Sequence, residues 1–123
     1  MKKIIYLLTT VLLTFFSNNS LIDSEKKDQY SCKPKHAAAI RSNGIQTFKI
    51  KGDEKPVLLS IYKGFLETND MKYKLYEAGG RAFAFSPERA WVHFQDITVL
   101  DNGQLSFVMA VNSSISRYLC DKK

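Results

Sequence analysis

Three side chains in this sequence are of the types that cleave a phosphodiester bond: Glu67, Arg81 and His93. A glutamate can accept the proton of a 2′-hydroxyl, a histidine can protonate the leaving oxygen, and an arginine can stabilise the charge on the phosphate. Their spacings of 14 and 12 residues are unspecific in a chain with twelve acidic residues. A strand histidine on the same face as Trp91 is the favoured interpretation of His93, so we expect no catalytic residue.

In type and order the same trio resembles the microbial ribonucleases, which are small, basic, exported domains. The resemblance implies a glutamate base, a histidine acid and an arginine that holds the phosphate. The chain departs from that family because it has no amphipathic helix early in the domain and because His93 lies in the run Trp91-Val92-His93-Phe94. A secreted ribonuclease-like phosphodiesterase is therefore an alternative, and the first expectation is that the protein is not an enzyme.

The sequence contains no motif for the other kinds of reactive site that we considered. The sequence contains neither the G-x-S-x-G of a serine nucleophile nor the G-x-x-x-x-G-K of a phosphate-binding loop. Two histidines, His36 and His93, and two cysteines do not occur at zinc-finger spacing. We therefore expect no metal and no cofactor.

Aromatic and basic residues alternate in the middle of the chain. Most aromatic residues of a small β domain pack in its core, but rings next to cations can also bind a sugar or an anionic polymer. Turns and an irregular loop converge in this region, and loops carry binding residues. The predicted, speculative ligand site consists of Lys72, Tyr73, Lys74, Tyr76, Arg81 and Trp91.

The N-terminus has the pattern of a secretory signal peptide. Lys2 and Lys3 precede 13 mostly apolar residues, 4–16, which as a helix would span about 20 Å, too short for a hydrocarbon core of about 30 Å. We predict a signal peptide over 1–20, a flexible lead-in over 21–28 and one domain over 29–123. An uncleaved membrane anchor is the alternative. The mature chain is then exported, periplasmic or secreted, with no transmembrane segment.

Two cysteines, Cys32 and Cys120, lie near the two ends of that domain. In an oxidising compartment two cysteines most simply form one disulfide. The crosslink would close a loop of 88 residues, which the chain-entropy treatment values at about 4–5 kcal/mol. We expect it to join the first and last strands and to help close the sheet.

The residues between the cysteines have the pattern of short strands separated by turns. We predict an all-β fold, a single antiparallel β-sandwich or small β-barrel of about seven or eight short strands. Asn102-Gly103 predicts a two-residue type I′ turn. Residues 36–41 suit a strand or a helical turn equally, and residues 86–89 suit one turn of helix. The predicted strands are 47–51, 56–62, 71–75, 81–85, 96–101, 104–111 and 115–120.

Tyr30-Ser31-Cys32 and the late cysteine resemble the periplasmic inhibitors of c-type lysozyme, which are small disulfide-closed β-barrels. The serine- and lysine-bearing loop with which those inhibitors fill the lysozyme cleft is not recognisable here. From residue 21 onward the chain has 16 Lys and Arg against 12 Asp and Glu, or +4, the wrong sign for a strongly cationic lysozyme. A lysozyme-inhibitor-like protein is thus a further alternative.

The favoured function is a small exported non-enzymatic domain. Its expected partner is a protein or an anionic envelope component, because a moderate and spread positive charge favours anionic surfaces. No nucleic acid partner is expected.

Overall fold

The computed structural model describes residues 21–22 and 25–123, so the predicted signal peptide over 1–20 lies outside the described residues. The described chain is all-β, as predicted, with one short turn of 3₁₀ helix. None of its helices is long and apolar enough to cross a membrane. The elements are β1 (Asp28–Arg41), β2 (Gly44–Phe48), β3 (Val57–Tyr62), β4 (Phe65–Glu67), β5 (Lys72–Ala78), β6 (Arg81–Phe85), η1 (Pro87–Arg89), β7 (Val92–Val99), β8 (Leu105–Val111) and β9 (Ser114–Lys122).

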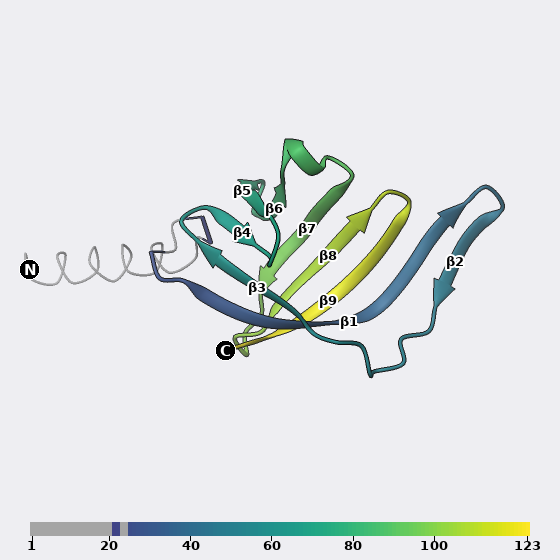
Figure 1. Cartoon of the computed structure of the whole chain (residues 1–123), viewed down its shortest axis with the longest axis horizontal. Coiled ribbons are helices and arrows are strands. Elements are labelled where there is room, and N and C mark those ends of the chain that lie inside the picture. The colour runs from purple at the N-terminus through teal and green to yellow at the C-terminus, as the bar shows by residue number, and fades with distance from the viewer. Residues whose placement is uncertain (1–20, 23–24) are drawn as a thin grey trace, which may run out of the picture.

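The sheet closes into a barrel (Figure 1). Its strand order is β2-β1-β3-β4-β5-β6-β7-β8-β9, every pairing is antiparallel, and β1 also pairs with β9. Eight strands therefore form the barrel, and β2 is an additional strand attached to β1. Of the two predicted architectures, the small barrel is the one that forms. Closure leaves the barrel strands without open edges.

The long strand β1 changes partner halfway along. Its residues Asp28–Cys32 pair with β3, whereas Ala37–Arg41 pair with β2, and a register shift between Pro34 and His36 separates the two halves. Residues 36–41, for which the sequence left strand and helical turn open, are thus a strand. The second half of β1 stays paired with β9 as far as Ala39 and carries β2 on its other edge. We call this hairpin of β1 and β2 the arm, which extends farthest to the right in Figure 1.

The sequence predicts strands 47–51 and 56–62 on either side of a turn at residues 51–54, but these two strands do not pair with each other. β2 ends at Phe48 and pairs with β1 rather than β3. The sequence Ser42-Asn43 makes a two-residue connection that sets Arg41 directly opposite Gly44, and such tight turns favour pairing of the adjacent strands. The later turn is instead a loop in which the Glu54 carboxylate accepts the N–H groups of Lys51 at 3.0 Å and of Gly52 at 2.9 Å.

The turn at Asn102-Gly103 is present, but it is not type I′. That type needs positive φ at both central residues, and Gly103 has φ +87° whereas Asn102 is not among the described residues with positive φ. The Gly103 N–H donates to the Leu100 carbonyl at 2.9 Å, and the Asn102 Oδ1 accepts the Gln104 N–H at 3.0 Å. The hairpin loop is therefore longer than predicted, since β7 ends at Val99 and β8 begins at Leu105, and the Asn102 side chain caps the residue before β8.

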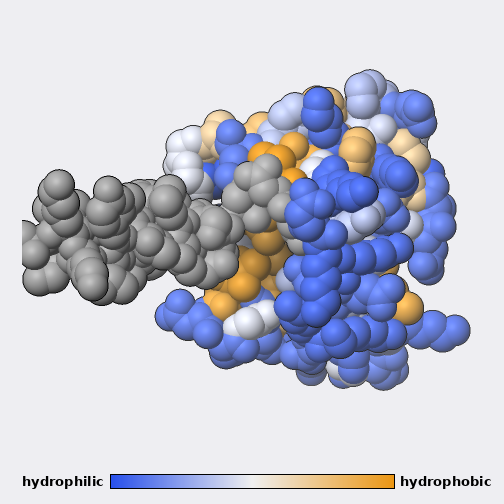
Figure 2. Space-filling view, turned by 90° about the vertical axis from the view of Figure 1, so that its left-hand side faces the viewer, coloured by the Kyte–Doolittle hydropathy of each residue, from blue (hydrophilic) through white to orange (hydrophobic). Residues whose placement is uncertain are grey.

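Aromatic and aliphatic side chains fill the barrel interior. The rings of Tyr73 and Phe94 meet edge-to-face at 4.8 Å, and those of Phe94 and Phe107 at 5.5 Å. Leu21 and Ile22 pack against this core. Figure 2 views the molecule from the side at the left of Figure 1, where hydrophilic residues cover most of the visible surface and hydrophobic residues show between them in several places.

The disulfide Cys32–Cys120 is present as predicted. The two residues are direct partners in the ladder between β1 and β9, and both are fully buried. The crosslink therefore joins the first and last strands at the seam where the barrel closes.

Candidate ligand-binding face

The alternation of β5 places the predicted site residues on both sides of the barrel wall. Lys72 and Lys74 are exposed and Tyr76 is half-buried on the outer side. Tyr73 faces inward and is only 3% exposed. Tyr73 was part of the predicted site, but it is a core residue: successive side chains of a strand point to opposite faces, so it cannot share a surface with its two lysine neighbours.

The neighbouring strand β6 shows an inverted pattern that sequence reasoning missed. Its alanines, Ala82 and Ala84, are buried inside the barrel, whereas Phe83 and Phe85 lie on the outer face, half-buried. Burial of phenylalanine releases more free energy than burial of alanine, so composition alone predicts the opposite arrangement. The small alanines fit because large rings from neighbouring strands already fill the interior.

The outer rings form a stacked cluster across β5 and β6. Tyr76 lies opposite Phe83 in the ladder, with ring centroids 5.3 Å apart and planes at 15°. Its ring is also 5.3 Å from that of Phe85, at 20°. The Lys74 Nζ lies 5.4 Å from the centroid of the Tyr76 ring, a cation–π distance. We call Tyr76, Phe83, Phe85 and Lys74 the aromatic platform.

Two open grooves meet at this platform. The first has a volume of about 520 Å³ and runs over β6 and β7, and the second, of about 620 Å³, runs over β4, β5 and the loop to η1. Phe85 lines both grooves. The polar or charged residues of the first are Arg81, His93, Gln95 and Asp96.

A bulge in β7 supplies two of these polar groups. Asp96 has φ +51°, and the register of β7 shifts on both sides of the strand near this residue. Phe94 and Ile97 both face inward as a result, and Gln95 and Asp96 are both exposed beside the groove. Bulges often re-aim side chains next to binding sites.

Fixed contacts hold the polar residues of this groove. Asp96 forms an ion pair with Arg117 at 3.0 Å, and Arg117 donates to the Ser106 hydroxyl at 2.8 Å. The His93 Nε2 is 2.8 Å from the Ala90 carbonyl oxygen, so that nitrogen carries the proton and donates it. The other ring nitrogen, Nδ1, is then left for a ligand.

The cations of this face differ in whether they form an ion pair with an acidic side chain. Lys72 forms an ion pair with Glu67 at 3.6 Å, and its Nζ also lies 5.6 Å from the centre of the Phe65 ring. Lys74 and Arg81 make no ion pair with a described residue. The positive charge available to an anionic ligand therefore comes from Lys74, which belongs to the aromatic platform, and from Arg81, which lies beside it in the β5–β6 ladder.

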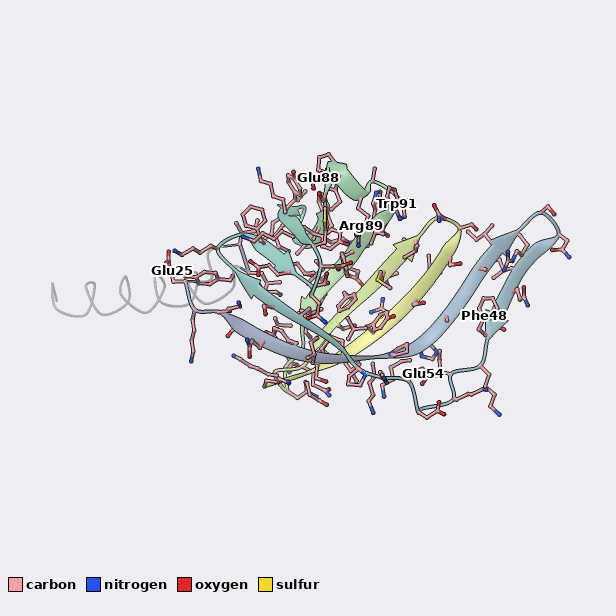
Figure 3. All side chains as sticks on the ribbon, in the orientation of Figure 1. Glu25, Phe48, Glu54, Glu88, Arg89 and Trp91 are labelled. Carbon is pink, nitrogen blue, oxygen red and sulfur yellow. A yellow bond between two sulfur atoms is a disulfide. The ribbon has the colours of Figure 1, made fainter. Side chains whose placement is uncertain are left out.

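Beside the second groove, Arg89 pairs with Asp70 at 3.0 Å, and this hydrogen bond holds the pKa of the Asp70 carboxyl below its usual value. Trp91 is not brought to the platform. It follows η1, is 54% exposed and lines neither groove, and its carbonyl accepts the Asn112 N–H at 3.0 Å (Figure 3).

The trio predicted from catalytic chemistry is only partly assembled. Arg81 and His93 line the same groove, whereas Glu67 lines other grooves and pairs with Lys72. Among the described residues, no group of three or more His, Cys, Asp or Glu is arranged to hold a metal ion.

Comparison of this chain with family models, curated proteins and solved structures finds no match.

Proposed function

We propose that the protein is an exported, non-enzymatic binding domain whose aromatic platform and flanking grooves hold an acidic glycan of the cell envelope or its surroundings. Export rests on the predicted signal peptide, and the disulfide accords with an oxidising compartment. The single observation that carries the proposal is the arrangement of side chains on β6. Phe83 and Phe85 lie on the outer face of this strand, while its alanines face the core.

The shape of the surface favours a polymer over a compact small molecule. Small-molecule sites are concave and bury most of their ligand, whereas these two grooves are open and Phe85 lines both of them. A chain of sugar rings can lie along them and cover the apolar ring faces of the platform. Such stacking removes apolar surface from water without enclosing the ligand.

The charges of the surface favour acidic sugars. Lys74 within the platform and Arg81 beside it form no ion pair with a described residue, and their charges can pair with carboxylate or sulfate groups of a glycan. Asp96 and Gln95 offer hydrogen-bond acceptors, and Gln95 also a donor, to sugar hydroxyls at the far side of the groove. Such a surface would distinguish ligands by their charge as well as by the shape of their sugar rings.

The test is a titration of residues 21–123 with alginate as the acidic polymer and dextran as the neutral one. We expect binding of alginate that weakens with salt. The double variant Lys74→Glu/Arg81→Glu should bind about tenfold less tightly or worse, about 1.4 kcal/mol. Lys123→Glu, a charge reversal away from the platform, is the matched control. Equal binding by the double variant and the control would refute the proposal.

One observation favours a second candidate function, inhibition of lysozyme. The disulfide-closed barrel agrees with the architecture that the resemblance to the lysozyme inhibitors implied. A lysozyme activity assay in the presence of the protein checks it, and inhibition that survives Lys74→Glu/Arg81→Glu would move the functional site away from the platform.

A further inference from the structure

The arm leaves one edge of the sheet open. β2 pairs with β1 on one side and with no described strand on the other, whereas the eight barrel strands have neighbours on both sides. All five residues of β2 are exposed. An open edge presents unpaired N–H and C=O groups, which another extended chain can complete.

The register identifies which backbone groups of β2 face outward. In a two-residue hairpin the residues that flank the turn, here Arg41 and Gly44, form a hydrogen-bonded pair, and such pairs alternate along the ladder. Ile45 and Thr47 therefore direct their N–H and C=O groups away from β1. The Ile40 N–H, opposite Ile45, indeed points to the other side and donates to the Ser113 carbonyl at 2.8 Å.

Apolar side chains lie on both faces of this edge. Ile45 is 74% exposed and lies opposite Ile40, itself 59% exposed. Phe48 is 42% exposed and lies on the other face, because it is three positions after Ile45 and side chains alternate along a strand. A strand added to β2 would cover apolar surface above and below the sheet at once.

The arm, its loop and the preceding residues of β1 together hold the whole net charge of the domain. Residues 32–56 contain six Lys and Arg against two Asp and Glu, while the remainder of 21–123 contains ten of each. None of the six cations forms an ion pair with a described residue. The carboxylate of one of the two acids, Glu54, accepts hydrogen bonds from backbone N–H groups. The six are Lys33, Lys35, Arg41, Lys49, Lys51 and Lys55.

From the open edge and this charge we propose that β2 docks an acidic, extended segment of a partner protein, which adds to the sheet as a tenth strand. A backbone is needed to complete the outward N–H and C=O groups, and a lipid surface cannot supply one in register. A second copy of this chain would set two clusters of unpaired cations against each other, which costs free energy. Acidic side chains on the added strand meet those cations instead.

This site is independent of the aromatic platform. In the strand order of the barrel, β5 and β6 lie farthest from β1 and β9, so the arm and the platform are on opposite sides. Figure 3 shows Phe48 and Glu54 at the lower right, on the arm and its loop, and Arg89 and Trp91 separately at the top of the molecule. The partner and the glycan need not compete.

Proline at position 47 separates the proposal from the rival explanations. Thr47→Pro removes an outward N–H without taking a hydrogen bond from the β1–β2 ladder, and proline is tolerated on edge strands. Thr47→Ala, which keeps the N–H, is the matched control. The probe is a fluorescent peptide that alternates Glu and Val, compared with the same peptide carrying Lys in place of Glu, on residues 21–123.

We expect the Glu peptide to bind with a Kd below about 1 mM and to weaken in salt, and the Lys peptide to fail. Thr47→Pro should weaken binding about tenfold relative to Thr47→Ala, and Lys74→Glu/Arg81→Glu should leave it unchanged. Three results would overturn the proposal: no binding of the Glu peptide, equal binding by both position-47 variants, or a concentration-dependent dimer of the protein alone that Thr47→Pro abolishes. Binding only to vesicles with anionic lipid would assign the arm to a membrane and overturn it as well.

Discussion

Removal of the disulfide is expected to lower the free energy of unfolding by about 4–5 kcal/mol while leaving the barrel intact at low temperature. Cys32 and Cys120 are separated by 88 residues in sequence. For a loop of that length the chain-entropy relation gives about 15 cal/mol/K, or about 4.6 kcal/mol at 25 °C. The effect acts on the unfolded chain, which becomes free to expand.

Strand pairing also keeps the native barrel closed when the disulfide is absent. The ladder between β1 and β9 contains nine cross-strand pairs, of which the cysteine pair is one. Both cysteines are fully buried, so alanine is a better replacement than serine, whose hydroxyl would be left unpaired in the core. The expected loss is nevertheless a large part of the stability of an ordinary small domain, about 5–15 kcal/mol.

Urea unfolding of the oxidised protein, the reduced protein and the variant Cys32→Ala/Cys120→Ala measures this loss. The variant should also show a larger m-value, because its unfolded state exposes more surface, and a Tm lower by roughly 20–35 °C. Far-UV circular dichroism at low temperature should remain that of the barrel. A loss below about 1 kcal/mol with an unchanged m-value would contradict the entropic reasoning.

Three further predictions concern the bulge and two titrating groups. Asp96→Val should cost about 1–2 kcal/mol more than Asp96→Asn, because asparagine tolerates the φ of +51° and valine does not; paired urea titrations check this, and equal values would contradict it. Burial raises the pKa of Tyr118, so the unfolded state loses its proton first and stability falls as pH rises from the ordinary tyrosine pKa to the raised one. Tyr118→Phe should flatten that alkaline decline in unfolding experiments between about pH 9 and about pH 11, and an unchanged decline would exclude Tyr118 as its source. The Arg89 hydrogen bond lowers the pKa of Asp70, so its contribution is complete above the ordinary aspartate pKa and is lost as pH falls through the lowered one; Asp70→Asn should reduce the acid-side slope, measured as stability against pH, and an identical slope would refute this.

Local patterns predicted most of the elements. The strand over 81–85 and the helical turn near 86–89 were read from alternation and from a proline after Ser86, and both are present. The disulfide followed from cysteine count and compartment. These features depend on residues that are close in sequence or on simple arithmetic.

Features set by the rest of the barrel were not predictable in this way. Alternation in β6 shows that two sets of side chains face opposite ways, but it does not say that the alanines are the inner set. That choice depends on how much of the interior the rings of Tyr73, Phe94 and Phe107 occupy. The partner of β2 was not predicted for a similar reason: turn-forming residues flank β2 at Asn43-Gly44 and at 51–54, and only the first turn makes a tight hairpin.

The length of β1 is the feature that connects the fold with the proposed functions. The pairing of β1 with its barrel neighbour β3 ends at Cys32, while its pairing with the other neighbour, β9, runs as far as Ala39. The strand nevertheless continues to Arg41, where it carries β2, and this extension brings the open edge that the closed barrel otherwise avoids. Open edges invite aggregation, and the surplus of cations on the arm opposes pairing between identical copies. The same surplus leaves the edge available to an acidic strand, so protection against self-association and selection of a partner follow from one charge distribution.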